Sequence, residues 1–450
     1  MKTTTKDLLS VLLPAGVSAR ARLARFAVTG VACLVLAGCG GGGGSSDATF
    51  DDGVALQEDA EWAEAIAVYD AVLADDPEHL GALFNRGVAK LESADASGAV
   101  ADFDGVLALA PDDLDAVLWR GAAYLEQGQA GKALADFDVV IDASPFAPEA
   151  YALRAQAHHD AGDYALALAD LDAAVRLEPD DPAYFEGRAD MFEAMQEPGA
   201  AEVERSLAAV TAQLVAQPDD PIARTRRGVA FLVLDEPELA LADLSIAIEA
   251  QPENLAARLA RGQCLVVLDE HGGALEDFAL VAEDREADPA IVAQARLGLA
   301  SVFESRGAFA DAAGEYETLR AGLNPAGILA TARLARLRAG CPEGAQRRPA
   351  LALELAREAL SRFDADLAAQ AETPAADEGG EAGGEAAAAA DTVDPNERWF
   401  YLDTLAAALV ADGQLAEGIA TQRQAVEAAP EDDRADLQAR LAAYRDAQSE

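Results

Sequence analysis

Small and large apolar residues follow one another along this chain in a fixed order. A small residue comes early in each cycle: Gly53, Gly87, Gly121, Ala155, Ala189, Gly228 and Gly262. In six cycles a second small residue lies 12 positions later: Ala65, Ala99, Ala133, Ala167, Ala240 and Ala274. Four positions further on comes a large one: Tyr69, Phe103, Phe137, Leu171, Leu244 and Phe278. Because residues four apart share one helix face, the order predicts paired helices that approach through small side chains.

Prolines set the length of the cycle. Pro77, Pro111, Pro145 and Pro179 are each 34 residues apart, and the same interval separates Pro218 from Pro252. Between Pro179 and Pro218 five residues are added, near residues 197–199. Since proline ends a helix, we expect two helices in each cycle, with the proline after the second.

This pattern resembles the tetratricopeptide repeat, a 34-residue pair of antiparallel helices. The resemblance covers about residues 47–366 and then 397–430. It implies an all-α fold, an α-solenoid in which helix pairs form a right-handed superhelix. We expect about nine units in 47–366, with degenerate units at 183–218 and 326–366, the latter carrying an extended loop from Gly340 to Pro349. Residues 397–450 would add a C-terminal repeat and a polar capping helix.

The N-terminal segment is typical of an exported bacterial lipoprotein. A basic start is followed by an apolar stretch, Phe26 to Leu36, that is too short to span a bilayer. Leu36, Ala37, Gly38 and Cys39 resemble the lipobox, which implies that residues 1–38 are a signal peptide and that Cys39 is lipidated. Residues 39–46 would then be a flexible Gly/Ser tether. The alternative is an ordinary signal peptide cut near the same place.

Charge narrows the set of partners. The chain carries 80 acidic and 34 basic residues, a formal net charge of −46, so we do not expect it to bind nucleic acid. The acidity either serves solubility or attracts basic partners. Residues 367–396 are rich in Ala, Gly and Glu, which predicts a disordered acidic linker.

Two ladders of opposite charge run in phase with the repeat. The arginine ladder is Arg86, Arg120, Arg154, Arg188, Arg227 and Arg261. The aspartate ladder, one residue before the large apolar position, is Asp102, Asp136, Asp170, Asp243 and Asp277. They predict partly buried Arg–Asp pairs that hold the register. The alternative is a row of arginines that binds an acidic ligand.

In the family this resembles, defined positions of the first helix line an inner groove. The early groove positions are apolar: Phe84, Val88, Leu91, Leu118 and Leu125. The middle ones are polar: Glu149, Gln156, His159, Asp160, Glu186, Asp190 and Glu193. The late ones are apolar again: Ile222, Val229, Leu232, Val233, Leu259, Val266 and Val267. Such a groove suits a segment with apolar anchors and basic residues between them. The alternative is that the apolar positions only pack against neighbouring repeats.

A basic patch interrupts the acidity near the degenerate unit at 326–366. Its members are Arg333, Arg336, Arg338, Arg347 and Arg348. They either bind an acidic partner or balance the surrounding acidity.

The sequence contains no motif for catalysis. Its four histidines have no metal-ligand spacing, and we find no phosphate loop or nucleophile elbow. We therefore expect no enzymatic activity, no cofactor and no small-molecule substrate. Cys264 and Cys341 are expected to be free thiols rather than a disulfide.

The hypothesis that best fits these features is a membrane-anchored scaffold that binds proteins or peptides in the bacterial cell envelope. It would lie at the outer membrane or the periplasmic face and assist assembly of envelope or secretion complexes. A passive structural or stress-related surface lipoprotein is the first alternative, and an enzyme with an unrecognised site is the second.

Overall fold

The computed structural model describes residues 45–322, 325–372 and 393–449, and every regular element in these ranges is helical. The described residues divide into two compact units, unit 1 up to Ala223 and unit 2 from Arg224. Among the helices of these ranges, none is both long and apolar enough to cross a membrane.

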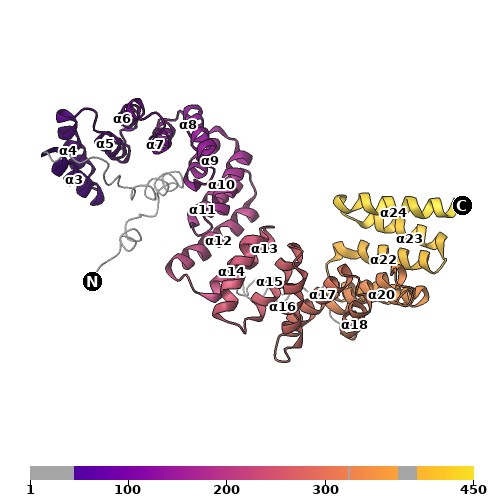
Figure 1. Ribbon diagram of the computed structural model, residues 1–450. Coiled ribbons are helices and arrows are strands. Elements are labelled where there is room, and N and C mark those ends of the chain that lie inside the picture. Colours follow the sequence, from indigo (N-terminus) through magenta and orange to yellow (C-terminus); the bar gives the residue numbers. More distant parts are fainter. Residues whose placement is uncertain (1–44, 323–324, 373–392, 450) are drawn as a thin grey trace. The chain divides into compact units, whose positions relative to one another are not determined.

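Unit 1 is a succession of antiparallel helix pairs, each packed on the next along the chain (Figure 1). Its helices are α3 (Ser45–Glu58), α4 (Trp62–Asp75), α5 (Leu80–Glu92), α6 (Ala96–Leu109), α7 (Leu114–Glu126), α8 (Ala130–Ala143), α9 (Pro148–Ala161), α10 (Tyr164–Leu177), α11 (Pro182–Ala194) and α12 (Pro198–Ala216).

Unit 2 continues the same pairing and adds a final helix. Its helices are α13 (Pro221–Val233), which begins in the last residues of unit 1, α14 (Pro237–Ala250), α15 (Leu255–Val267), α16 (His271–Glu283), α17 (Pro289–Ser305), α18 (Phe309–Arg320), α19 (Pro325–Gly340), α20 (Pro349–Glu372), the 3-10 turn η1 (Pro395–Glu397), α22 (Arg398–Ala411), α23 (Leu415–Ala428) and α24 (Glu431–Ser449). The polar α24 packs on α23 through Leu437 and Leu441.

The expected fold class, an α-solenoid of stacked helix pairs, is confirmed. In each of the six cycles marked by a proline, the second helix ends two residues before that proline, as α4 does before Pro77. The five added residues lie within α12, which has 19 residues where α10 has 14. The insertion therefore extends a helix instead of forming a loop.

The core of each pair depends on the alternation of small and large residues. The alanines at the second small position, such as Ala99 and Ala274, are fully buried, and so are the rings of Phe103 and Phe278. A Cβ placed on Gly262 would lie 2.5 Å from the Phe278 ring, and one on Gly298 of the next pair would lie 2.6 Å from it. Phe278 is thus enclosed by two glycines, which let both helices approach it.

Two predicted boundaries are corrected by the structure. Ser45 and Ser46, assigned to the tether, open α3. Residues 367–372, assigned to the linker, continue α20, because Leu360, Phe363 and Leu367 follow helical spacing and pack into one cluster with Val393. The predicted signal peptide, Cys39 and the segment 373–392 lie outside the described residues.

The glycine contact predicts opposite effects for two Gly→Ala substitutions in unit 2. Gly262→Ala forces a methyl group into the Phe278 ring and should lower the free energy of unfolding by about 1–3 kcal/mol. Gly314→Ala, on α18 with nothing within 4 Å of its Cβ, should raise that free energy by about 0.5–1 kcal/mol. Urea unfolding followed by circular dichroism measures both. Equal effects of the two variants would show that the close approach does not limit packing.

Candidate functional site

In unit 1 each ladder arginine joins two successive helix pairs. Arg120 of α7 donates from Nε and Nη2 to Asp136 of α8, at 2.9 and 2.8 Å, and from Nη1 to Asp104 of α6 at 2.9 Å. Arg86 and Arg154 repeat this arrangement with their own aspartates. The aspartate of the same pair is buried and the one from the preceding pair is exposed.

In unit 2 the ratio of arginines to carboxylates in each contact is the opposite of that in unit 1. Asp243 of α14 accepts from Arg227 at 2.6 Å and also from Arg224 at 2.6 Å. Asp277 likewise accepts from Arg261 and Arg258. Each of these aspartates binds two arginines of one helix, whereas each ladder arginine of unit 1 binds two carboxylates from different helix pairs.

The ladder also includes Glu204, a residue that the sequence analysis missed. Arg188 pairs with Glu204 of α12 at 3.0 Å and with Asp172 of α10 at 3.4 Å. Burial raises the pKa of Glu204, and the Arg188 guanidinium opposes that rise. Glu204 lies 16 residues after Arg188, the same spacing as Arg120 to Asp136, so this spacing could have identified it.

These contacts decide between the two interpretations of the ladders. Hydrogen bonding to Asp136 is the main reason that the pKa of Arg120 is raised, and the same holds for Arg154 with Asp170. Guanidinium groups held by two carboxylates are not available as a row that binds an acidic ligand. The ladders are structural pairs.

Most of the early groove positions are not open to a partner. Val88, Leu118 and Leu125 are buried in the core clusters of unit 1, and Phe84 and Leu91 pack against those clusters. For Val88, Leu118 and Leu125 the structure therefore agrees with the packing alternative, whereas the half-buried Phe84 and Leu91 keep part of their side chains exposed. The large side chains on these helices face the next helix pair, where Trp119 lies 6.4 Å from Phe84 between ring centroids.

The middle positions form a partly exposed acidic surface on unit 1. Glu186 is exposed, while Glu149, Asp190 and His159 are half-buried. Gln156 is buried and donates to Asp160 at 3.0 Å, so it is not a contact residue. Burial raises the pKa of Asp190, and the Glu193 carboxylate adds to that rise.

The late positions divide into a buried and an exposed group. Leu259 is buried, and Leu232 and Val266 are half-buried. Ile222, Val229, Val233 and Val267 are exposed. Val233 and Val267 are the last residues of α13 and α15, and at the start of α15 its N-cap residue Asn254 donates a hydrogen bond of 3.0 Å to Thr225 of α13. An exposed apolar surface therefore remains on unit 2.

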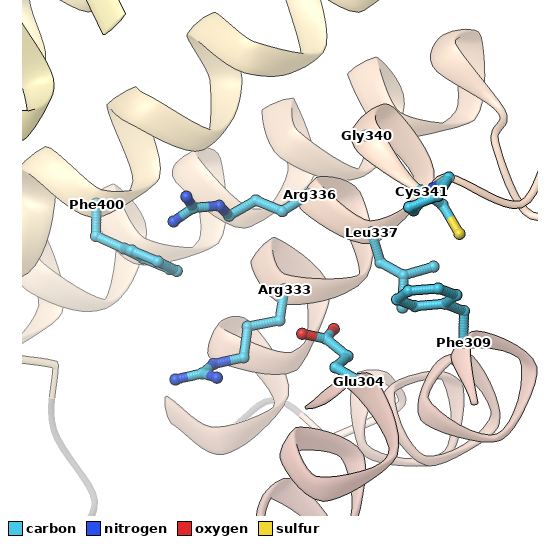
Figure 2. A pocket seen from close by; sticks show the side chains of 9 residues that line it. Glu304, Phe309, Arg333, Arg336, Leu337, Gly340, Cys341 and Phe400 are labelled. Carbon is cyan, nitrogen blue, oxygen red and sulfur yellow. The ribbon is translucent and has the colours of Figure 1, made fainter. Parts of the chain in front are cut away.

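The five arginines of the basic patch do not form one surface. Arg338 is buried and donates to Gln346, while Arg347 and Arg348 are exposed in the loop between α19 and α20. Arg333 and Arg336 line a pocket together with Glu304 and Phe400 (Figure 2).

Neither cysteine of the described chain forms a disulfide. Cys264 and Cys341 are free and buried, as predicted. Burial raises the pKa of the Cys264 thiol to about 11, so it is not a reactive thiolate at neutral pH. Within the residues described, no group of three or more His, Cys, Asp or Glu side chains could hold a metal ion.

The comparison with protein families agrees with this geometry. Residues 50–93, 87–148, 152–207 and 225–291 match the family model for the Tetratricopeptide repeat. The chain is a tetratricopeptide repeat protein. Proteins of this family typically are non-catalytic scaffolds whose repeats bind proteins or peptides.

Solved structures with some likeness to this tetratricopeptide repeat protein include MamA from Desulfovibrio magneticus RS-1. It is 21% identical, with 38% of this chain and 97% of that chain covered, at a TM-score of 0.35. A tetratricopeptide repeat protein from Parabacteroides merdae is 17% identical, with 57% and 100% covered, at 0.33. TM-scores this low add nothing to the family match. No curated protein matches the chain.

The buried pair of unit 2 predicts a large effect for one arginine and none for its neighbour. The side chains of Arg227 and Asp243 are 2% and 4% exposed. Arg227→Ala leaves the buried Asp243 with Arg224 as its remaining arginine partner. This loss should lower the free energy of unfolding by about 3 kcal/mol. Arg226→Ala, exposed on the same helix, should change it by less than about 0.5 kcal/mol. Urea unfolding compares the two, and similar losses would contradict a structural role of the ladder.

Proposed function

We propose that this protein is a scaffold of the bacterial cell envelope that holds segments of other proteins on its exposed repeat surface. The observation that carries the proposal is the exposed apolar surface of α13 and α15. Val233 is 76% exposed and Val267 is 57% exposed, and the two valines occupy the same position in neighbouring repeats. Stacked repeats bring equivalent positions onto one face, and exposed apolar residues gathered on one face mark partner-binding surfaces.

The chemistry of the partner follows from the charge around this position. Asp235 and Asp269 each follow one of these valines by two residues and are exposed, and the chain as a whole has a net charge of −46. A segment with apolar anchors for the valines and basic residues beside them would satisfy both features. Electrostatic attraction would also speed its encounter with so acidic a chain.

The location in the envelope rests on the N-terminal sequence. The apolar stretch that ends in the lipobox-like residues Leu36 to Cys39 supports export and a lipid on Cys39. A lipid anchor would place the scaffold at the outer membrane or the periplasmic face, where it would assist assembly of envelope or secretion complexes. A passive surface lipoprotein is the alternative, and it would need no defined partner.

The binding surface is tested by replacing both valines with a polar residue of similar helical preference. We expect the double variant Val233→Gln, Val267→Gln to lower the recovered amount of specific partner proteins at least fivefold, because apolar anchors contribute most to such contacts. The measurement is quantitative mass spectrometry of proteins cross-linked to the chain in its native host. Leu280→Gln is the control, since Leu280 is 52% exposed on α16 of the same unit.

The control defines the result. Partners that are lost with the valine pair and kept with Leu280→Gln support the scaffold. If both variants retain the same proteins as the unaltered chain, the α13–α15 surface is not where partners bind, and a passive role is favoured.

The anchor is tested separately. The N-terminus of the processed protein should begin at an acylated Cys39, and the protein should sediment with membranes, because two or three acyl chains hold a protein firmly. Mass spectrometry of the N-terminal peptide measures the modification, with Cys39→Ala as the control. An unmodified N-terminus together with soluble behaviour would contradict the lipoprotein assignment.

A further inference from the structure

A pocket of about 450 Å³ opens in unit 2 among α17, α18, α19 and α22. Its charged side chains are Glu304, Arg333 and Arg336. Its apolar lining is Phe309, Leu337, Pro342 and Phe400. Arg333, Arg336, Leu337 and Gly340 follow the spacing of one helix face, and Figure 2 shows both arginine side chains reaching in the same direction from α19.

Arg333 differs from the ladder arginines because it lacks a carboxylate partner. No carboxylate oxygen lies within 4 Å of its guanidinium in the described part of the chain, and its Nε is buried without a hydrogen-bond partner. This is unusual in a protein with 80 acidic residues against 34 basic ones. The Arg333 side chain has the Tyr316 hydroxyl as a hydrogen-bond partner and lines the pocket, where a guanidinium that is not neutralised by a carboxylate can receive the anionic group of a ligand.

Arg336 adds a second positive charge to the same wall. Its guanidinium carbon lies 5.4 Å from the centre of the Phe400 ring, and its Nη2 is 3.6 Å from Asp403. Asp403 is itself buried and also binds Arg440 and Gln422. One carboxylate is therefore shared by two arginines, and the positive charge of Arg336 is only partly compensated.

Glu304 limits how much negative charge the pocket can accept. Burial raises the pKa of this carboxyl, while the Tyr316 hydroxyl, Arg333 and Arg336 oppose the rise. A ligand with two or more negative charges would be repelled by an ionised Glu304, whereas one negative charge is matched by the two arginines. The apolar residues that line the pocket together with the arginines favour a ligand whose charge is attached to an apolar group.

We propose that this pocket binds an organic monocarboxylate, with the carboxylate at Arg333 and Arg336 and an apolar body against Phe309, Leu337 and Phe400. The pocket volume lies in the range of about 300–1,000 Å³ typical of small-ligand sites. The same chemistry occurs in a free carboxylic acid and in an acidic side chain next to an aromatic one on a partner protein. The pocket contains none of the groove positions, so the proposal is independent of the α13–α15 surface.

The proposal is tested by calorimetric titration of the full chain at low salt with three probes. These are 3-phenylpropanoate, its uncharged analogue 3-phenylpropanamide, and the peptide acetyl-Gly-Phe-Glu-Gly-amide. We expect the acid to bind at least tenfold more tightly than the amide, because charge-assisted hydrogen bonds to arginine are lost in the amide. Tighter binding of the peptide than of the acid would identify a partner's acidic side chain as the source of the carboxylate.

Three variants separate the pocket from the general charge of the chain. Arg333→Gln should weaken binding of the acid at least tenfold, and Arg347→Gln should change it less than about twofold. Arg347 is exposed in the loop after α19 and its substitution removes the same charge. Glu304→Gln should strengthen binding about two- to fivefold, a gain that a misfolded variant cannot produce.

The proposal is wrong if the acid and the amide bind equally, or if Arg347→Gln weakens binding as much as Arg333→Gln. It is also wrong if neither the acid nor the peptide binds the unaltered chain with a Kd below about 5 mM.

Discussion

The close approach of two helices at a residue without a side chain is the constraint on which the rest of this structure depends. At Gly121, Gly228 and Gly262 an added Cβ would lie within 2.7 Å of the large residue on the facing helix. That large residue, Phe137, Leu244 or Phe278, is fully buried as a result. Where alanine replaces the glycine, at Ala155 and Ala189, the residue is still small and buried. Successive pairs therefore present equivalent positions to each other, and the remaining contacts can repeat.

The charged ladders show that one repeat geometry accepts two electrostatic solutions. In unit 1 an arginine binds the aspartates of two successive pairs, so its contacts connect neighbouring repeats. In unit 2 an aspartate binds two arginines of one helix, so its contacts remain within a pair. Arg296 and Glu315 keep the 19-residue spacing of Arg224 and Asp243, although the ladder position itself is Leu299 there. The charged residues of a buried pair can therefore differ between repeats, provided that each buried charge keeps at least one partner of opposite charge.

The surfaces available for binding are those that this packing leaves over. Apolar residues of α5 and α7 pack in contacts between helix pairs, while Val233 and Val267 at the ends of α13 and α15 remain exposed. The pocket at Arg333 arises where the regular ladder has ended and the loop after α19 replaces a short turn. The pocket therefore lies where the repeat departs from its pattern, whereas the α13–α15 surface lies within regular repeats.

The sequence by itself determined the helix pairs, their period, the buried alanines and the pairing of the two ladders, because these features recur at short, constant separations. The separation of 16 residues between Arg120 and Asp136 is an example, and the same separation relates Arg188 to Glu204. Only the tertiary structure decided that Val88 is buried and Val229 exposed at the same repeat position, since exposure depends on side chains of neighbouring pairs. The same holds for the pocket, where Glu304, Arg333 and Phe400 come from three helices spread over nearly a hundred residues. No periodicity links such positions, because their proximity results from the packing of whole helices and not from local spacing.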